Sequence, residues 1–230
     1  MYIVALSKWL LRSAKESTLL AQKHHINLPN PIDTTLFKPI DRIEARKLWR
    51  LPQNKKLVLF GSMNPFDDPR KGFSKLSEAL RCMTRSDDTE LVIFGSSQPQ
   101  HPSEYGFKTH YAGSIQDDVS LATLYSAVDV MVVPSLQENL SNAIMESLSC
   151  GTPVVGFGIG GNSDLVEHLQ NGYLAKPFDP ADLANGIDWV LYEADYTALC
   201  RNARQKVVRE SDSRVVAKKY IALYEKILNG

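Results

Sequence analysis

Short apolar runs alternate with longer amphipathic stretches along most of the chain. The runs are continuous rather than alternating, and most of them end at a glycine or a proline. They cover Leu57–Phe60, Leu91–Phe94, His110–Ala112, Asp129–Val133, Pro153–Phe157 and Tyr173–Ala175. Continuous apolar runs of this length are typical of parallel strands that are covered on both faces. We therefore expect each run to be a strand of one buried sheet.

The stretches between these runs repeat their apolar residues at helical spacing. In the first of them, Lys71–Arg85, the apolar positions include Phe73, Leu76 and Leu80. Strands that alternate with helices predict an α/β fold, a doubly wound Rossmann-like parallel sheet with helices on both faces. Such sheets bind ligands beyond the carboxyl ends of their strands. The other predicted helices are Ser120–Ala127, Asn142–Cys150, Ser163–Gln170, Ala181–Leu191, Tyr196–Arg209 and Arg214–Leu228.

The first fifty residues have a different pattern. Tyr2–Leu6 has the character of a strand, and Ser7 is placed to cap a helix over Lys8–Lys23. A turn-rich stretch around Pro29–Asp33 follows, and then a helix predicted over Asp41–Arg50. A chain that opens on a strand in this way is expected to be part of a larger unit.

Composition removes several classes of function. Lys and Arg total 26, Asp and Glu also total 26, and the net charge of zero gives no basic field for nucleic acid. Cys82, Cys150 and Cys200 lie far apart without metal-ligand spacing, which favours a reduced, intracellular protein and no metal site. No apolar run approaches the roughly 20 residues of a transmembrane helix. No serine or cysteine nucleophile motif accompanies the histidines, so a hydrolase triad is not supported.

The strongest candidate site follows the run that ends at Val133. A polar loop leads into a helix that starts near Ser141, and the first turn of a helix offers free N–H groups to an anion. Glu138 lies in the loop, and Glu146 lies eight residues later, about one turn into the helix. Carboxylates accept hydrogen bonds from sugar hydroxyls. The alternative is that Glu146 only stabilises the helix dipole and Glu138 is solvated.

Two further loops carry candidate chemistry. After Gly61, the adjacent Arg70 and Lys71 could bind a diphosphate, or they could be solvated surface charges paired with Asp67 and Asp68. Those aspartates could also hold Mg²⁺, although a third ligand is absent from the motif. The glycine-rich Gly156–Asp164 segment does not match the dinucleotide-binding fingerprint, but its backbone can approach a ligand closely.

Together these motifs resemble one family, the group 1 (family 4) retaining glycosyltransferases of the GT-B fold, and specifically their C-terminal nucleotide-sugar-binding domain. The branch most similar builds bacterial exopolysaccharides of the colanic-acid type. The opening of the chain resembles the hinge into that domain. The resemblance is carried by Ser7–Leu10, Pro29–Pro39, Arg70–Phe73, the pair Glu138 and Glu146, Ser149–Val155, Gly160–Gly161 and Asn171–Leu174.

The resemblance implies roles for individual residues. Lys71 would bind the donor diphosphate, Glu138 would face the donor sugar, and Glu146 would hold the ribose. The family's arginine after the first-strand glycine is absent, because Ser62 follows Gly61, and Arg70 is a candidate replacement. The other implied contacts are the amides of Asn139, Leu140 and Ser141 with the diphosphate, and Gly113, Ser114 and Ile115 with the base. No metal or other cofactor is implied.

The resemblance also implies an organisation. Residues 1–40 would be the hinge and entry segment from an N-terminal acceptor half, 41–212 the donor domain, and 213–230 a helix that crosses back. The partners would be a nucleotide sugar and a glycan or lipid-linked acceptor in the cytoplasm, peripherally at the inner membrane face. The chain alone is expected to be inactive and to self-associate through exposed apolar residues. Alternatives are a non-catalytic nucleotide-sugar-binding module, another GT-B enzyme such as an epimerase or a phosphorylase, and an interaction domain.

Overall fold

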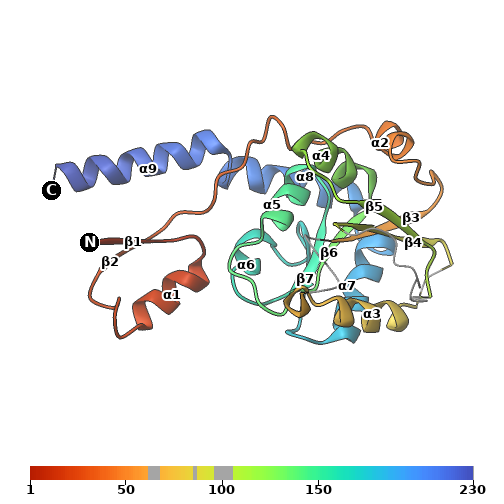
Figure 1. Ribbon diagram of the computed structural model, residues 1–230, viewed down its shortest axis with the longest axis horizontal. Coiled ribbons are helices and arrows are strands. Elements are labelled where there is room, and N and C mark those ends of the chain that lie inside the picture. The colour runs from red at the N-terminus through yellow and green to blue at the C-terminus, as the bar shows by residue number, and fades with distance from the viewer. Residues whose placement is uncertain (62–67, 85–86, 96–105, 230) are drawn as a thin grey trace.

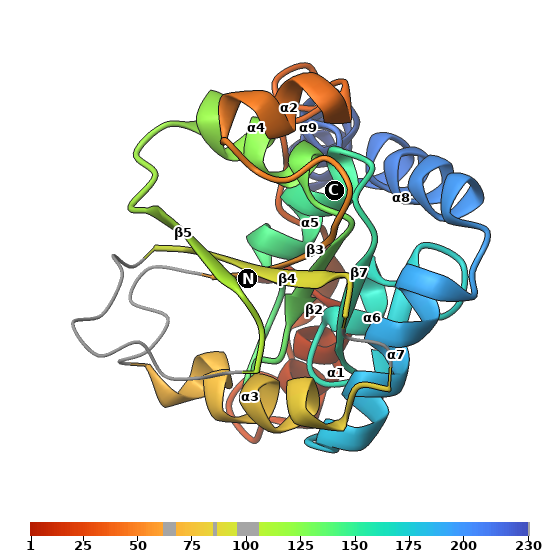
Figure 2. The same cartoon turned by 90° about the vertical axis from the view of Figure 1, so that its right-hand side faces the viewer.

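The structure is a computed structural model, and it describes residues 1–61, 68–84, 87–95 and 106–229. Within these residues, six parallel strands form one sheet in the order β5-β4-β3-β6-β7-β8 (Figures 1 and 2). All six were predicted from the apolar runs, which confirms the doubly wound fold class. Their bounds are Lys56–Gly61 (β3), Thr89–Phe94 (β4), Thr109–Gly113 (β5), Val130–Val133 (β6), Val154–Phe157 (β7) and Gly172–Ala175 (β8).

Helices cover both faces of this sheet, as Figure 2 shows. Leu76 of α3 and Leu183 of α7 pack in the apolar core on one face. Ala45 of α2, Ile144 of α5 and Ala203 of α8 pack in the core on the other, together with α4. The helix bounds are Arg42–Leu48 (α2), Phe73–Cys82 (α3), Asp118–Ala127 (α4), Asn142–Ser149 (α5), Asn162–Leu165 (α6), Pro180–Tyr192 (α7) and Tyr196–Glu210 (α8).

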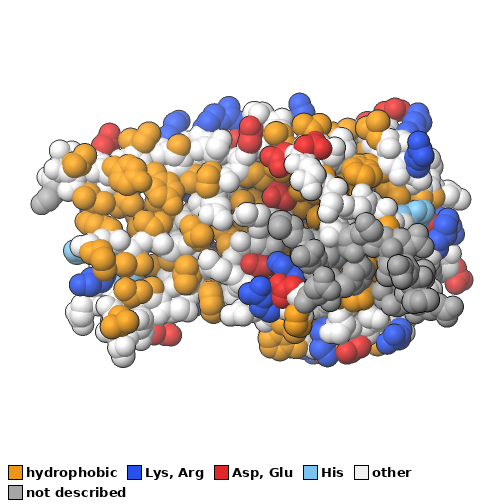
Figure 3. Space-filling view, in the orientation of Figure 1, with side chains coloured by type: hydrophobic (Ala, Val, Ile, Leu, Met, Phe, Trp, Pro, Cys, Tyr) orange, Lys and Arg blue, Asp and Glu red, His pale blue; other side chains and the backbone are white. Residues whose placement is uncertain are grey.

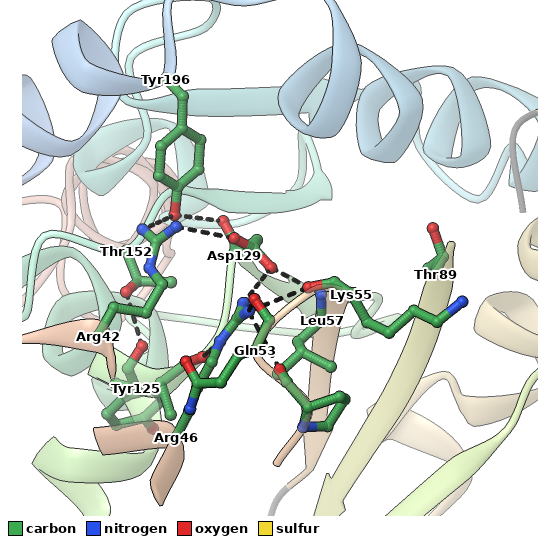
Figure 4. A network of polar contacts seen from close by, with 12 residues as sticks. Arg42, Arg46, Gln53, Lys55, Leu57, Thr89, Tyr125, Asp129, Thr152 and Tyr196 are labelled. Atoms are coloured by element: carbon green, nitrogen blue, oxygen red, sulfur yellow. Dashed lines mark hydrogen bonds and ion pairs between the residues drawn. The ribbon is translucent and has the colours of Figure 1, made fainter. Parts of the chain in front are cut away.

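A buried ion pair fastens α2 to the amino ends of the central strands (Figure 4). Asp129 lies just before β6 and is 4% exposed; its carboxylate accepts hydrogen bonds from Arg46 at 2.7 Å and from the backbone N–H of Leu57 at 2.7 Å. Arg42 adds a second ion pair to the same carboxylate at 2.8 Å. Arg46 also donates to four backbone carbonyls, so each nitrogen of this buried guanidinium has at least one hydrogen-bond acceptor.

A separate small unit lies to one side of the main sheet (Figure 1). Its strands pair in parallel, with Tyr2 opposite His24. The long C-terminal helix α9 lies on the same side. Two chain segments connect this side to the main domain, one before α2 and one between α8 and α9. They are hydrogen-bonded to each other at Ile32 and Asp212. Ile32 N–H donates to Ser211 O and Ser213 N–H donates to Ile32 O, both at 2.9 Å. The elements of this side are Tyr2–Ala5 (β1), Lys8–Glu16 (α1), His24–Asn27 (β2) and Ser213–Leu228 (α9).

Three predicted helices differ in the structure. The first ends at Glu16 instead of Lys23, and the chain turns back into the unpredicted strand β2. The helix predicted over 163–170 is only one turn long, since the Asn171 side chain accepts from Glu167 N–H and draws the chain into β8. The helix predicted from Lys71 begins at Phe73, after a 3₁₀ turn over Pro69–Lys71 (η1). Arg70 and Lys71 therefore lie on that turn and not in a helix.

Candidate functional site

The strand order places a switch point between β3 and β6. From β3 the chain continues toward β4 on one side, and from β6 it continues toward β7 on the other. The loops that leave these two neighbouring strands diverge, and the gap between them is where ligands bind in sheets of this type. The two strongest sequence candidates, Lys71 and Glu138, come from these two loops.

The two loops enclose a pocket at the carboxyl edge of the sheet. It has a volume of about 310 Å³ and is lined by Lys71 and Glu138 together with Asp68, Arg70, Gln137 and Asn139. A narrower hollow continues from it toward the ends of the strands, and Lys71 and Glu138 line this one too, with Gly61 and Ser141 among its other residues. The side chains of Lys71 and Glu138 and the start of the helix at Ser141 therefore border the same connected pocket.

Close backbone contacts fix the position of Lys71. The next residue, Gly72, has φ +70°, and a Cβ placed there would be 1.9 Å from the carbonyl oxygen of Pro134. On the same loop, Leu136 N–H donates to Arg70 O at 2.8 Å. Only glycine fits at position 72, because any side chain would be both strained and in collision with the loop after β6. The two site loops are therefore held together by their main chains.

The loop with Glu138 rests on the glycine-rich segment after β7. A Cβ at Gly160 would be 1.7 Å from the Glu138 carbonyl oxygen, and one at Gly161 would be 1.9 Å from that of Asn139. The Gly156–Asp164 segment was expected to approach a ligand; its backbone approach in the structure is to the site loop instead. The segment supports the site loop from below and lines neither of the two hollows in the described residues.

Helix α5 begins at the site with Ser141 as its N-cap, whose side chain accepts from Ile144 N–H. No described residue accepts a hydrogen bond from the amides of Leu140 and Ser141; Ser141 lines the narrower hollow, whereas Leu140 is buried and lines neither hollow. The Asn139 amide differs from them, since it donates to the carboxylate of Glu138 at 3.2 Å. Of the three amides predicted to contact an anion, that of Ser141 thus borders the hollow without an acceptor in the described residues, and that of Asn139 is engaged by the neighbouring carboxylate.

The two adjacent cations, Arg70 and Lys71, differ in their exposure and in their ion pairs. Arg70 is exposed and pairs with Asp68 through two hydrogen bonds of 3.0 and 2.9 Å; these bonds hold the pKa of Asp68 below its ordinary value. Of the two possibilities that the sequence left open for Arg70, the structure shows the pairing with an aspartate of the same loop. Lys71 is half-buried and makes no ion pair with any residue that the structure describes. Lys71 is thus the cation that the pocket offers.

Glu146 is not among the residues that line the two hollows, and its carboxylate accepts a hydrogen bond from the Tyr125 hydroxyl at 3.0 Å. Burial raises the pKa of this carboxyl above its ordinary value, against the smaller lowering by the tyrosine hydroxyl. Tyr125 itself is fully buried and packs edge-on against Phe94. A half-buried carboxylate held by one donor keeps acceptor capacity for hydroxyl groups.

The remaining predicted residues lie around the site. Gly113, with φ +70°, ends the edge strand β5; Ser114 is exposed, and Ile115 packs on the core. Together with the buried Leu140, they line neither hollow. Ser62 and Asp67 lie outside the described residues. The sequence predicted Ser7 as a helix cap, but it gave no sign that Ser7 also contacts Asn139 of the site loop.

A larger hollow, of about 420 Å³, lies near the amino ends of the strands and has Cys150 and Cys200 in its lining. Burial raises the pKa of Cys150 to about 12 and also raises that of Cys200. Both thiols are therefore protonated at neutral pH and are poor nucleophiles. In the described residues, no group of three or more His, Cys, Asp or Glu side chains could hold a metal ion.

Comparison with known proteins agrees with this geometry. A family model for glycosyl transferases of group 1 matches residues 54–193, which run from before β3 through α7. The chain belongs to this family. The fold and the group 1 glycosyltransferase family expected from the motifs are thereby confirmed, and the family's switch-point region lies within the matched residues.

Individual glycosyltransferases match more of the chain. An uncharacterized glycosyltransferase of Methanocaldococcus jannaschii is 26% identical over 193 residues, 80% of this chain and 48% of that protein. A D-inositol 3-phosphate glycosyltransferase of Acidothermus cellulolyticus is 29% identical over 195 residues, 79% of this chain and 44% of that protein. This group 1 chain thus spans about half the length of the curated relatives it matches.

Solved structures share the fold over nearly the whole chain. Sucrose-phosphate synthase from Thermosynechococcus elongatus matches with a TM-score of 0.84 and 26% identity, over 99% of this chain and 58% of that chain. Anabaena HepE, solved in complex with UDP-glucose, matches with a TM-score of 0.78 and 22% identity, over 98% and 64%. The match includes the β1–α1–β2 unit and α9 as well as the main sheet. None of the described helices is both long and apolar enough to cross a membrane.

Proposed function

We propose that this chain is the donor-binding part of a retaining glycosyltransferase that takes a hexosyl group from a nucleotide-diphosphate sugar. The observation that carries the proposal is the pairing of Lys71, without an ion-pair partner among the described residues, with Glu138 in one pocket at the switch point. A diphosphate needs a cation and free amides, and a sugar needs a carboxylate acceptor. Family membership and the HepE complex with UDP-glucose support the same donor class.

The proposed reaction uses these groups as follows. Lys71 and the start of α5 stabilise the negative charge that develops on the departing diphosphate. Glu138 orients the sugar, and Glu146 accepts hydrogen bonds from the ribose. Arg70 joins the diphosphate only when it releases Asp68. No metal takes part. The acceptor, a glycan or lipid-linked sugar of polysaccharide biosynthesis, arrives on the face that the diphosphate leaves.

We further propose that sugar transfer needs the acceptor half that residues beyond this chain supply in a complete GT-B protein. The chain spans about half of the relatives' length, which supports this division. The place of action would be the cytoplasm, peripherally at the inner membrane face, where lipid-linked acceptors are met. The branch that builds colanic-acid-type exopolysaccharides is our proposed assignment.

Calorimetric titration of the chain with UDP, GDP and ADP, and then with their sugars, tests donor binding. We expect saturable binding of one nucleotide, weakened at least tenfold by Lys71→Ala and by Glu146→Ala. Lys75→Ala is the matched control, since Lys75 lies close by on α3 and already pairs with Glu78 at 3.0 Å. Equal weakening by the Lys75 variant, or no binding of any nucleotide at millimolar concentration, would contradict the proposal.

Kinetics of the complete protein test the catalytic assignment. Glu138→Ala and Lys71→Ala should each lower kcat/KM by more than tenfold, a loss above about 1.4 kcal/mol in transition-state stabilisation. Wild-type kinetics in either variant would remove that residue from the mechanism. Nucleotide binding without transfer by the complete protein would instead identify a non-catalytic binding module.

A further inference from the structure

The start of α1 contacts the site loop directly, although the two lie 132 residues apart in sequence. Ser7 is fully buried; its hydroxyl donates to the side-chain oxygen of Asn139 at 2.8 Å and accepts from Leu10 N–H at 3.0 Å. The next residue, Lys8, donates its backbone N–H to Asp164 at 2.5 Å. The β1–α1–β2 unit thus reaches the loops after both β6 and β7.

Ser7, Asn139 and Gly161 are in close contact here, and no space remains for a side chain at Gly161. A Cβ on Gly161 would be 2.7 Å from the Cβ of Ser7 and 1.9 Å from the carbonyl oxygen of Asn139. Close-packed contacts of this kind transmit a displacement instead of absorbing it. A shift of Ser7 must therefore move Asn139, the glycine segment or both.

The contact continues to the pocket. The Asn139 backbone N–H donates to the Glu138 carboxylate at 3.2 Å, and Glu138 lines both hollows of the site. Two hydrogen bonds therefore link Ser7 of the small unit to the Glu138 carboxylate. One is made by the side chain of Asn139 and the other by its backbone N–H. Hydrogen bonds from a fixed neighbour restrict the rotamer of a carboxylate and so its direction.

We propose that Ser7 is a positioning residue for Glu138, so that the placement of the β1–α1–β2 unit sets the direction of the sugar-facing carboxylate. This inference rests on the proposed function for the role of Glu138. It assigns to the small unit a part in recognising the donor sugar, separate from any part in binding the acceptor. Ser7 is not among the residues that line the two hollows, so its proposed effect on the donor passes through Asn139.

The first test separates the sugar from the nucleotide. The Kd values of UDP and of UDP-glucose are measured for wild type, Ser7→Ala and Asp41→Ala. Asp41 is the matched control because it caps α2 in the same way, by accepting from Glu44 N–H. In Ser7→Ala we expect an unchanged Kd for UDP and a ratio of the two Kd values shifted at least threefold. An unshifted ratio, or equal weakening of both ligands, overturns the proposal.

The second test is a double-mutant cycle with the same two ligands. If Ser7 acts through Asn139, Ser7→Ala adds nothing to the ratio once Asn139→Ala is present. Additive effects of the two substitutions would show that Ser7 acts by another route.

The third test needs no ligand. We expect the Asn139 amide to exchange its hydrogen at least threefold faster in Ser7→Ala and at the wild-type rate in Asp41→Ala. Failure of the wild-type chain to bind UDP would count against the proposed function, whereas an unchanged exchange rate in Ser7→Ala would count against the link itself.

Discussion

At the scale of single residues, the site depends on main-chain approaches that leave no room for side chains. Gly72 lies against Pro134, and Gly160 lies against Glu138. Both have positive φ, so glycine serves two needs at once, a left-handed backbone and a close contact. The charged residues of the pocket are therefore placed by neighbours that carry no chemistry of their own.

Gly160→Ala tests this account. Its φ of +51° is unfavourable for alanine, and the new Cβ would be 1.7 Å from the Glu138 carbonyl oxygen. We expect a loss of about 1–3 kcal/mol in the free energy of unfolding, measured with urea, together with weaker nucleotide-sugar binding. Gly158→Ala is the control, because Gly158 lacks positive φ and its nearest contact would be an ordinary 3.5 Å. Equal losses in the two variants would contradict the account.

At the scale of elements, buried strands were predictable and the shortest or least apolar elements were not. Residues 24–27 form β2 only because Tyr2 and its neighbours pair with them, and two consecutive histidines give no local sign of a strand. The end of α6 is decided by the Asn171 side chain, which no periodicity reveals. The local pattern thus predicts the strands of the main sheet. It fails where a single contact outside the pattern decides, as for β2 and for the end of α6.

The same division holds within the site. Glu138 and Lys71 were found because they follow strands of a parallel sheet, a rule that sequence can apply. The pairing of Arg70 with Asp68 was one of two open possibilities. The contact of Ser7 with Asn139 joins residues that lie 132 positions apart in sequence, so only the folded structure could reveal it.

The anchor of α2 gives a prediction at this scale. Asp129→Ala leaves the buried guanidinium of Arg46 without its carboxylate, and breaking a buried pair in this way costs about 3–5 kcal/mol. Lys47→Ala removes the exposed pair with Glu44 on the same helix and should leave the free energy of unfolding nearly unchanged. Urea unfolding of both variants checks the difference. Similar losses would mean that the Asp129 pair adds little to stability.

At the scale of the whole molecule, apolar side chains remain exposed over the β1–α1–β2 unit and α9 (Figure 3). Ile221, Tyr224 and Leu228 lie at helical spacing on α9, so they share one face, and each is more than half exposed. Leu19 beside α1 is 83% exposed. An exposed apolar face such as this one favours contact with another apolar surface.

We therefore expect the 230-residue chain to self-associate through this face. Sedimentation velocity should show a rising weight-average mass with concentration, and Ile221→Lys combined with Tyr224→Lys should abolish the rise. Val119→Lys is the control, since Val119 is 62% exposed on α4 of the main domain. A wild-type chain that stays monomeric at all concentrations, or a control that behaves like the double variant, would refute the expectation.

The junction at Ile32 and Asp212 has a mechanical consequence. The chain leaves the small unit once before α2 and enters α9 once after α8, and the two passages are hydrogen-bonded to each other at this point. Two chain segments that are hydrogen-bonded side by side act as one pivot about which the small unit can turn. Any such turn has to break the bonds of Ser7 with Asn139 and of Lys8 with Asp164, because both join the small unit to the main domain.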